Sequence, residues 1–247
     1  MKKFLLLGLI LVVLGSLMVA SGSCSSTPLK IQVVTDATYP PFEYVDTETG
    51  EIVGFDIDVM NAIAEKANLD IEFVNVGWDP LLAGMAQGTY ACAISCITIT
   101  PARAEEMLFS TPYFTAGQIV VVQKGNTSFT SKDDLTGEVG AQLGTTGAME
   151  VEALPNCTLK NYDEIGLAFQ DLMNGQISAV ICDAPVAKGY VATNSDKLKT
   201  IGEMFTTEQY GIAVSKGNED LLAKINTAIQ AIIDEGLIDQ YALKWLS

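Results

Sequence analysis

The sequence contains one arginine, Arg103, and the residues around it indicate a binding site for an anion. Thr100 is a suitable N-cap and Pro101 a suitable first helical residue, which places Arg103 in the first turn of a helix. The N–H groups of that turn are unpaired and carry the positive end of the helix dipole. A guanidinium beside them can bind both oxygens of a carboxylate. The alternative is a surface arginine paired with Glu105 or Glu106.

The sequence Gly-Thr-Thr-Gly at residues 144–147 is a second candidate site for an anion. It joins an expected strand to an expected helix. Its glycines let the backbone approach a ligand, and the free N–H groups of the helix start point outward. The segment lacks the lysine of a phosphate-binding loop, so we do not expect a nucleotide. The alternative is an ordinary tight turn.

Three further residues extend these two half-sites into a cleft. Asp183 follows an apolar strand, and ligands of open α/β sheets bind at the carboxyl ends of strands, where an acid can pair with an ammonium group. Tyr39 and Trp78 lie in expected loops and can bracket a ligand side chain, including a cation. The alternative for both aromatic residues is plain packing. Together the residues predict a site for a zwitterionic amino acid.

Composition excludes several other classes of function. The 247 residues include 14 Lys and Arg against 30 Asp and Glu, a net charge of -16, which argues against nucleic-acid binding. The absence of histidine excludes histidine zinc sites, Ser-His-Asp triads and Cys-His pairs. A content of 49% hydrophobic residues supports one large core or two smaller ones. We therefore expect binding rather than hydrolysis, with no cofactor and no metal.

The first 28 residues have the pattern of an export signal. Lys2 and Lys3 precede an apolar run over residues 4–20, and small residues at 21–23 lead into Cys24. We expect a signal peptide over residues 1–23, a lipid on Cys24 and a tether over residues 24–28. The protein would then be attached by its lipid to the outer face of the cell membrane or lie in the periplasm. The alternative is an uncleaved anchor helix.

The four remaining cysteines do not form an obvious disulfide framework. Cys92 and Cys96 are four residues apart on an expected strand, which puts their Cα atoms roughly 13 Å apart. That separation is too large for a disulfide, so we expect small buried hydrophobic residues. A pairing of Cys157 with Cys182 is left open.

Strands alternate with helices along the chain, which predicts an α/β protein with parallel sheets covered on both faces. Asp56 is expected as the N-cap of a helix that ends before Asn68. Further helices are expected to start at 79 and 100, to follow residues 144–147, and to run over 164–174, 219–235 and 237–245. The expected strands are 31–34, 71–73, 91–95, 119–122, 138–142, 158–161 and 177–182.

These motifs resemble the family 3 extracellular solute-binding proteins, the polar amino-acid receptors of ABC importers. The likeness covers nearly all of the chain after residue 24 and rests on Asp36–Phe42 with Glu43 and on the segments 54–58, 78–79, 97–103, 109–114, 144–147 and 183–187. It implies the two-lobed periplasmic-binding-protein fold of type II, with two doubly wound sheets joined by two hinge strands. Residues 29–114 and 210–247 would form lobe 1 and residues 118–206 lobe 2, with hinges near 114–118 and 206–210.

The resemblance also implies a role for each residue of the cleft. Arg103 would hold the ligand α-carboxylate, assisted by the backbone N–H groups of Thr98 and Thr146. Asp183, the Thr98 hydroxyl and the carbonyl of Cys96 would take the α-amino group. The residues expected around the ligand side chain are Asp36, Tyr39 and Trp78, with Ser95, Gln142, Thr145 and Gly147 nearby.

Several positions depart from the family pattern. The family often has an aspartate at Ala91 and small residues at Cys92 and Cys96, and Cys182 replaces varied residues near the ligand side chain. Because the expected amino-acid backbone site is intact, these departures concern ligand specificity more than protein class.

The expected function is therefore that of a monomeric receptor without a catalytic step. It would deliver a polar or basic L-amino acid, arginine first and glutamine second, to an ABC permease and its ATPase subunits by lobe closure. The alternative is an enzyme on the same fold, similar to cyclohexadienyl dehydratases, with a carboxyl such as Asp36 or Asp183 as general acid.

Overall fold

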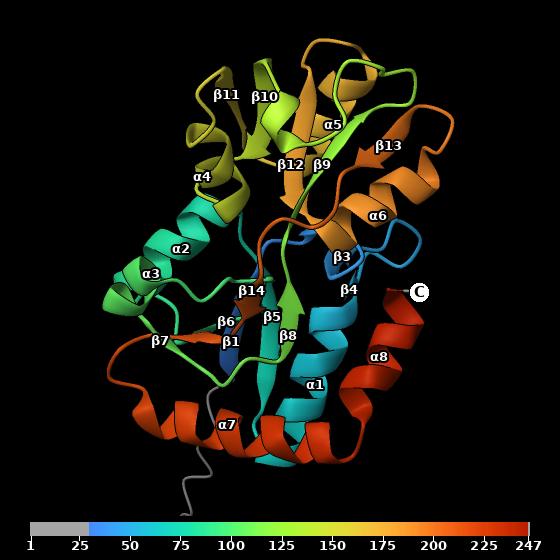
Figure 1. Ribbon diagram of the computed structural model, residues 1–247. Helices are drawn as coiled ribbons and strands as arrows, with labels where there is room; N and C mark the ends of the chain where they lie inside the picture. The colour runs from blue at the N-terminus through green and yellow to red at the C-terminus, as the bar shows by residue number, and fades with distance from the viewer. Residues whose placement is uncertain (1–29, 247) are drawn as a thin grey trace, which may run out of the picture.

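Two five-stranded sheets, one in each of two lobes, form the framework of the computed structural model, which describes residues 30–246 (Figure 1). The expected signal peptide, Cys24 and the tether lie outside the described residues. The first sheet has the order β5 (Ile71–Asn75), β1 (Ile31–Thr35), β6 (Cys92–Ala93), β15 (Ala213–Val214) and β7 (Leu108–Phe109). The second has the order β11 (Cys157–Tyr162), β10 (Gly137–Gln142), β12 (Ala179–Asp183), β9 (Gln118–Gln123) and β13 (Leu198–Ile201).

Helices pack on both sheets, and two small sheets complete the fold. The small sheets are β2 (Thr38–Tyr39), β3 (Glu43–Val45) and β4 (Ile52–Val53), and the pair β8 (Phe114–Ala116) and β14 (Glu208–Tyr210). The helices of the first lobe are α1 (Phe55–Ala67), α2 (Trp78–Ala86), α3 (Pro101–Glu106), α7 (Glu219–Asp234) and α8 (Leu237–Trp245). Those of the second lobe are α4 (Thr146–Glu152), α5 (Ile165–Met173) and α6 (Ala184–Thr193).

Each large sheet contains one strand that runs against the other four, so the expectation of purely parallel sheets is wrong. In the first sheet this strand is β15, and in the second it is β9. Each is the first strand that the chain forms in a large sheet after crossing from the other lobe. A strand that the chain forms just after passing from one lobe to the other runs away from the junction of the lobes, whereas strands β1, β6, β10 and β12 run toward that junction. Their carboxyl ends therefore face the space between the lobes.

The start of helix α1 differs from the expected one. The helix begins at Phe55 with Gly54 as its N-cap, not with Asp56. Gly54 has φ 138, and a Cβ there would lie 2.0 Å from the carbonyl oxygen of Phe42, so a glycine is needed at this point. Asp56 is fully buried instead and accepts hydrogen bonds from the N–H of Cys96 and the hydroxyl of Tyr113, both at 2.8 Å. The expected end of the helix at Asn68 is confirmed, with φ 49.

The strand expected over 91–95 is shorter in the structure, which changes the argument about Cys92 and Cys96. Strand β6 ends at Ala93, and Cys96 has φ 48 in the turn that follows. The two cysteines therefore do not lie on one strand, and strand geometry does not give the distance between them. Both are nevertheless buried free thiols, as expected. Within the described residues Cys157 and Cys182 are free as well, so the pairing left open is not formed.

Some elements were not expected from the sequence. Helix α6 starts directly after Asp183, and strand β13 follows it at the edge of the second sheet. The apolar run over residues 210–214 is divided between β14, which ends at Tyr210, and β15, which begins at Ala213. The division separates a strand at the crossing between the lobes from a strand of the first sheet, a distinction that the continuous apolar run does not reveal.

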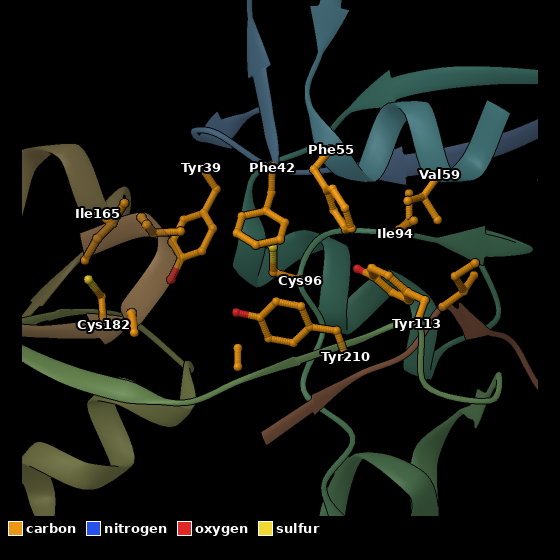
Figure 2. Close-up of a cluster of buried hydrophobic side chains, with 14 of the residues drawn as sticks. Tyr39, Phe42, Phe55, Val59, Ile94, Cys96, Tyr113, Ile165, Cys182 and Tyr210 are labelled. Atoms are coloured by element: carbon orange, nitrogen blue, oxygen red, sulfur yellow. The ribbon is translucent and has the colours of Figure 1, made fainter. Parts of the chain in front are cut away.

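Alternate residues of the strands pack into different layers, as expected for sheets covered on both faces. In β9, Ile119 and Val121 belong to the largest hydrophobic cluster, whereas Val120 and Val122 pack on the opposite face. The largest cluster continues from one lobe to the other through Tyr39 and Tyr210, and Figure 2 shows these rings beside Phe42. A continuous core therefore passes through the region where the lobes meet.

The two crossing segments lie in close contact. Strands β8 and β14 pair in antiparallel fashion within the ranges expected for the hinges. Gly117 follows β8, and a Cβ at this position would lie 2.0 Å from the carbonyl oxygen of Thr206 in the other crossing segment. That the chain pivots at these strands, and that the lobe limits are those expected, stay predictions. Within residues 30–246, no helix combines the length and apolar character that crossing a membrane requires.

We predict that Gly117→Ala destabilises the protein by about 1–3 kcal/mol, because the added methyl group overpacks the contact with Thr206. Urea unfolding of the ligand-free protein measures this change. Gly125→Ala is the matched control, since a Cβ there meets nothing within 4 Å and the change should stay within about 0.5 kcal/mol. Equal stability of the two variants would contradict the prediction.

Candidate functional site

A cavity lies between the two lobes, at the carboxyl ends of β1, β6, β10 and β12. All predicted site residues except Gly147 line it. Its lining residues are Asp36, Tyr39, Glu43, Trp78, Ser95, Cys96, Thr98, Arg103, Gln142, Thr145, Thr146 and Asp183.

Arg103 is held at the wall of this cavity. Its N–H donates to the Thr100 hydroxyl at 3.2 Å, so the predicted N-cap is confirmed. The side chain is only 7% exposed, and the alternative of a surface arginine is wrong. Nη1 donates to the carbonyl of Thr98 at 2.8 Å and Nη2 to the carbonyl of Gly144 at 3.1 Å, and the guanidinium lies 5.2 Å from the ring of Trp78. Since a guanidinium has five N–H donors, it can still bind a carboxylate.

Asp183 ends strand β12 in the other lobe and lines the same cavity. Its carboxylate accepts hydrogen bonds from the hydroxyl of Tyr39 and, at 3.0 Å, from Nε2 of Gln118. Burial raises the pKa of Asp183 to about 6, the bond from Tyr39 lowers it, and the nearby charge of Glu208 raises it further. At neutral pH the group is therefore ionised and can pair with a cation.

A second group of polar residues lies in the same cavity. Gln142 donates to Asp36 at 2.9 Å, and Ser95 donates to Glu43 at 2.9 Å while its oxygen accepts from the N–H of Asp36. Burial raises the pKa of Asp36. Glu43, which is fully buried, belongs to one of the motifs that resemble the family, but it was not predicted as a site residue. The feature of the sequence that could have identified Glu43 is its position as an acidic residue directly after the apolar residue Phe42.

Glu43 lies against a second buried acid, Asp56. Oxygen atoms of these two groups and the sulfur of Cys96 all lie within 4.8 Å of one another. Two donors already bind Oδ2 of Asp56, and no donor among the described residues binds its Oδ1. Burial, followed by the charge of Asp56, raises the pKa of Glu43 well above its usual range, and burial raises the pKa of Asp56 to about 6. A shared proton fits this pair better than a cation does.

The Gly-Thr-Thr-Gly segment forms the expected turn between β10 and α4. Thr145 is the N-cap and accepts from the N–H of Ala148 at 3.2 Å. Gly147 is buried and does not line the cavity. A Cβ there would lie 2.9 Å from the oxygen of the Gln118 side chain and from the carbonyl oxygen of Ile181, so the position requires a glycine. Its contribution is close packing against the second sheet.

Sequence reasoning missed two further polar residues of this region. Gln118 donates to both Thr146 and Asp183. Glu208 accepts from Thr98 and Thr146 at 2.8 Å each. Both were expected only as parts of hinge segments, and no local motif distinguishes them, because their partners lie far away in the sequence.

Direct contacts between the lobes close the cavity. They leave a free volume of about 20 Å³, which is room for about one water molecule. A molecule larger than water can therefore enter only after these contacts separate. The contacts are Arg103 to Gly144, Tyr39 to Asp183, and Gln142 to Asp36.

Comparisons with known proteins give similarity over both lobes. The family model of bacterial extracellular solute-binding proteins, family 3, matches residues 31–247. A probable histidine-binding protein of Neisseria gonorrhoeae is 35% identical over 232 residues, which are 90% of this chain and 85% of that protein. Putative ABC transporter arginine-binding protein 2 of Escherichia coli strain K12 is 34% identical over 241 residues, covering 94% of this chain and 98% of that protein. The structure of an ancestral arginine-binding protein bound to arginine has a TM-score of 0.84 and 41% identity, covering 88% of this chain and 98% of that one.

We predict that the ligand-free protein becomes more stable as the pH falls from 7 to 5. Burial raises the pKa of Asp56 and of Asp183 to about 6, so the folded state binds more protons than the unfolded state between about pH 6 and 4. Between pH 7 and 5 each group should add roughly 1 kcal/mol of stability. Urea unfolding at pH 7, 6 and 5 measures the change.

Asp183→Asn is the control for this pH dependence, because it removes one of the two groups and should reduce the gain. The exposed Asp46 and Asp134 act in the opposite direction, but their lowered pKa values confine that effect to more acidic solutions. A loss of stability between pH 7 and 5 would contradict the assignment.

Proposed function

Because the chain belongs to the bacterial extracellular solute-binding proteins of family 3, we propose that it is an exported receptor that delivers a polar or basic L-amino acid, arginine first and glutamine second, to an ABC importer. The observation that carries the proposal is the pair of opposite charges, Arg103 from one lobe and Asp183 from the other, on the wall of one buried cavity. This pair complements the two charged ends of an amino acid.

The α-carboxylate of the ligand binds Arg103, and the α-ammonium group binds Asp183. A hydrogen bond to a charged group contributes roughly 1.5–3 kcal/mol, and exclusion of water from the cavity strengthens each of them. The ring of Trp78 lies against the guanidinium and limits its movement. The backbone of the ligand is thus recognised whatever its side chain.

The carboxylate of Asp36 favours a cationic side chain. Asp36 lines the cavity and has no cationic partner among the described residues, whereas Glu43 shares a proton with Asp56. A ligand guanidinium replaces the bond from Gln142 to Asp36 and supplies the missing positive charge. Glutamine can make the same hydrogen bonds through its amide but brings no charge, which is why it ranks second.

Ligand binding stabilises the closed arrangement of the lobes. The contacts between the lobes must open for entry, and a ligand that binds both lobes shifts the population toward the closed state. The closed form then docks on a membrane permease that works with ATPase subunits. The lipid on Cys24 attaches the receptor to the outer face of the cell membrane or holds it in the periplasm. The receptor acts as a monomer.

The receptor carries out no catalytic step. A dehydratase on this fold needs a general acid, and without histidine that acid is a carboxyl such as Asp36 or Asp183. Asp183 instead accepts hydrogen bonds from Tyr39 and Gln118, as an ammonium partner does. Turnover of prephenate or arogenate by the purified protein would contradict the proposal.

We predict that Arg103→Ala weakens amino-acid binding by at least about 100-fold, because the ligand carboxylate loses a bidentate charged partner. Arg103→Lys should restore only part of the affinity, since an ammonium group cannot bind both oxygens in the same geometry. Isothermal titration calorimetry measures both. Lys124→Ala, an exposed cation outside the cavity, is the control and should leave binding unchanged. Unchanged affinity in Arg103→Ala would reject the proposal.

We predict that Asp36→Asn lowers the affinity for arginine by about 10-fold and that for glutamine by less than about 3-fold, because the change removes a charge but keeps a hydrogen-bonding group. A thermal-shift panel of the common L-amino acids identifies the ligands, and calorimetry then compares the variant with the wild type. Asp196→Asn, an exposed residue of the second lobe, is the control. Stabilisation of the wild type by leucine but not by arginine or glutamine would overturn the proposed specificity.

A further inference from the structure

Glu208 is a buried carboxylate in the second crossing segment between the lobes, at the start of β14. It is 9% exposed and lies beside the cavity without lining it. No lysine or arginine among the described residues forms a salt bridge with it. A buried carboxylate without a cationic partner requires several hydrogen-bond donors.

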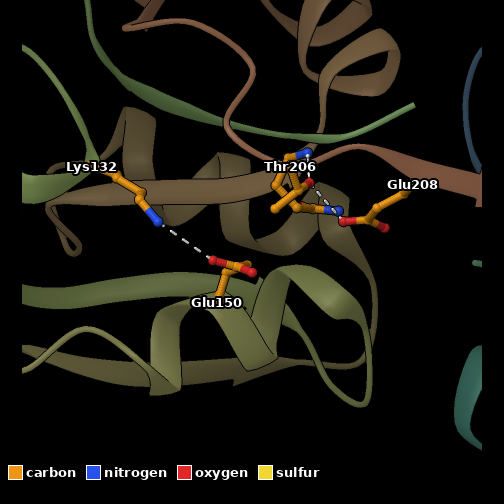
Figure 3. Close-up of polar contacts among 5 residues, drawn as sticks. Lys132, Glu150, Thr206 and Glu208 are labelled. Carbon is orange, nitrogen blue, oxygen red and sulfur yellow. Dashed lines mark hydrogen bonds and ion pairs between the residues drawn. The ribbon is translucent and has the colours of Figure 1, made fainter. Parts of the chain in front are cut away.

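Three threonine hydroxyls supply those donors, and they come from three different parts of the chain. Thr98 of the first lobe and Thr146 of the second both donate to Oε2 of Glu208 at 2.8 Å. Thr206 of the crossing segment donates to Oε1 at 2.9 Å, and Figure 3 shows this contact. The oxygen of Thr206 also accepts from the N–H of Gln118 in the other crossing segment at 2.7 Å. One carboxylate thus joins both lobes and both crossings.

These bonds fix the direction of the hydroxyl groups in the cavity. A hydroxyl has a single proton, so a threonine that donates to Glu208 presents only lone pairs elsewhere. The oxygen of Thr146 already accepts from Nε2 of Gln118 at 3.1 Å. The oxygen of Thr98 lines the cavity and can accept from a donor there, such as an ammonium group, but cannot donate to a carboxylate.

The negative charge of Glu208 also favours an ammonium group over a carboxylate in this part of the cavity. Its proximity raises the pKa of Asp183, as expected for two carboxylates close together, and favours the charged form of Arg103. The ammonium end of an amino acid placed between Asp183 and Thr98 would relieve this repulsion. The hydroxyl direction and the charge therefore select the same chemical group.

We propose that Glu208 is a positioning residue of the ligand site, which orients the hydroxyls of Thr98 and Thr146 and so couples closure of the lobes to capture of the ligand α-ammonium group. This inference rests on the proposed function, because it assumes an amino-acid ligand. It assigns to the crossing segment a part in recognition in addition to its part in joining the lobes.

The test compares each ligand with an analogue that lacks the α-amino group. For L-arginine the analogue is 5-guanidinopentanoate, and for L-glutamine it is 4-carbamoylbutanoate. We expect Glu208→Gln to weaken binding of the amino acid at least 10-fold, because its amide donates to a threonine and turns that hydroxyl away from its acceptor role. The affinity for the analogue should change less than 3-fold. A residue with a purely structural role would change both affinities by the same factor.

Two further variants keep the test independent of folding defects. Thr98→Val leaves Glu208 in place and should give the same selective loss of affinity for the amino acid. The double variant Glu208→Gln with Thr98→Val should lose little more affinity than either single variant. Thr227→Val is the control, since the exposed hydroxyl of Thr227 donates to the carbonyl of Ala223 within α7, away from Glu208 and the cavity, and it should change both affinities less than 3-fold. Far-UV circular dichroism and thermal unfolding verify that each variant is folded.

The outcomes separate the two proposals. If the wild type binds no L-amino acid, the proposed function fails and this inference fails with it. If the wild type binds but Glu208→Gln and Thr98→Val bind equally well, or lose amino acid and analogue affinity in equal proportion, only the inference about Glu208 is overturned.

Discussion

The burial of one guanidinium among several carboxyl groups is the constraint on which the site depends. Arg103 is the only arginine of the chain, and it lies at the wall of a cavity with acids around it. Burying carboxylates without enough cationic partners costs free energy. Hydrogen bonds from hydroxyl and amide groups reduce this cost, as does protonation of a carboxylate. The acids concerned are Asp36, Glu43, Asp183 and Glu208.

The topology explains why these charges meet. Each large sheet has one strand that leaves the crossing and others that end there, so the turns after β1, β6, β10 and β12 converge on the same space. For two of the acids the donors come from the opposite lobe or from both lobes: Tyr39 donates to Asp183, and Thr98 and Thr146 donate to Glu208. In the structure, the contacts between the lobes are therefore also bonds that satisfy buried carboxylates.

Much of the fold and of the site could be predicted from local patterns. The family resemblance is confirmed by the match over residues 31–247, and the α/β lobes follow from the alternation of strands and helices. Predictions failed where a distant contact overrides the local signal. Asp56 resembles an N-cap but is buried against Cys96 and Tyr113, and Gly54 begins the helix because only a glycine fits against Phe42.

The sequence by itself determined the chemistry that is available: one arginine, no histidine, an excess of acids, the N-cap Thr100 and the Gly-Thr-Thr-Gly turn at residues 144–147. These features depend on residue types and on spacings of a few residues. Only the tertiary structure decided that Glu43 lines the cavity, that Glu208 bonds to Thr98 beside it, and that Trp78 lies against Arg103. Their partners are brought close by the packing of the two lobes, and no local periodicity encodes a contact between residues 110 positions apart.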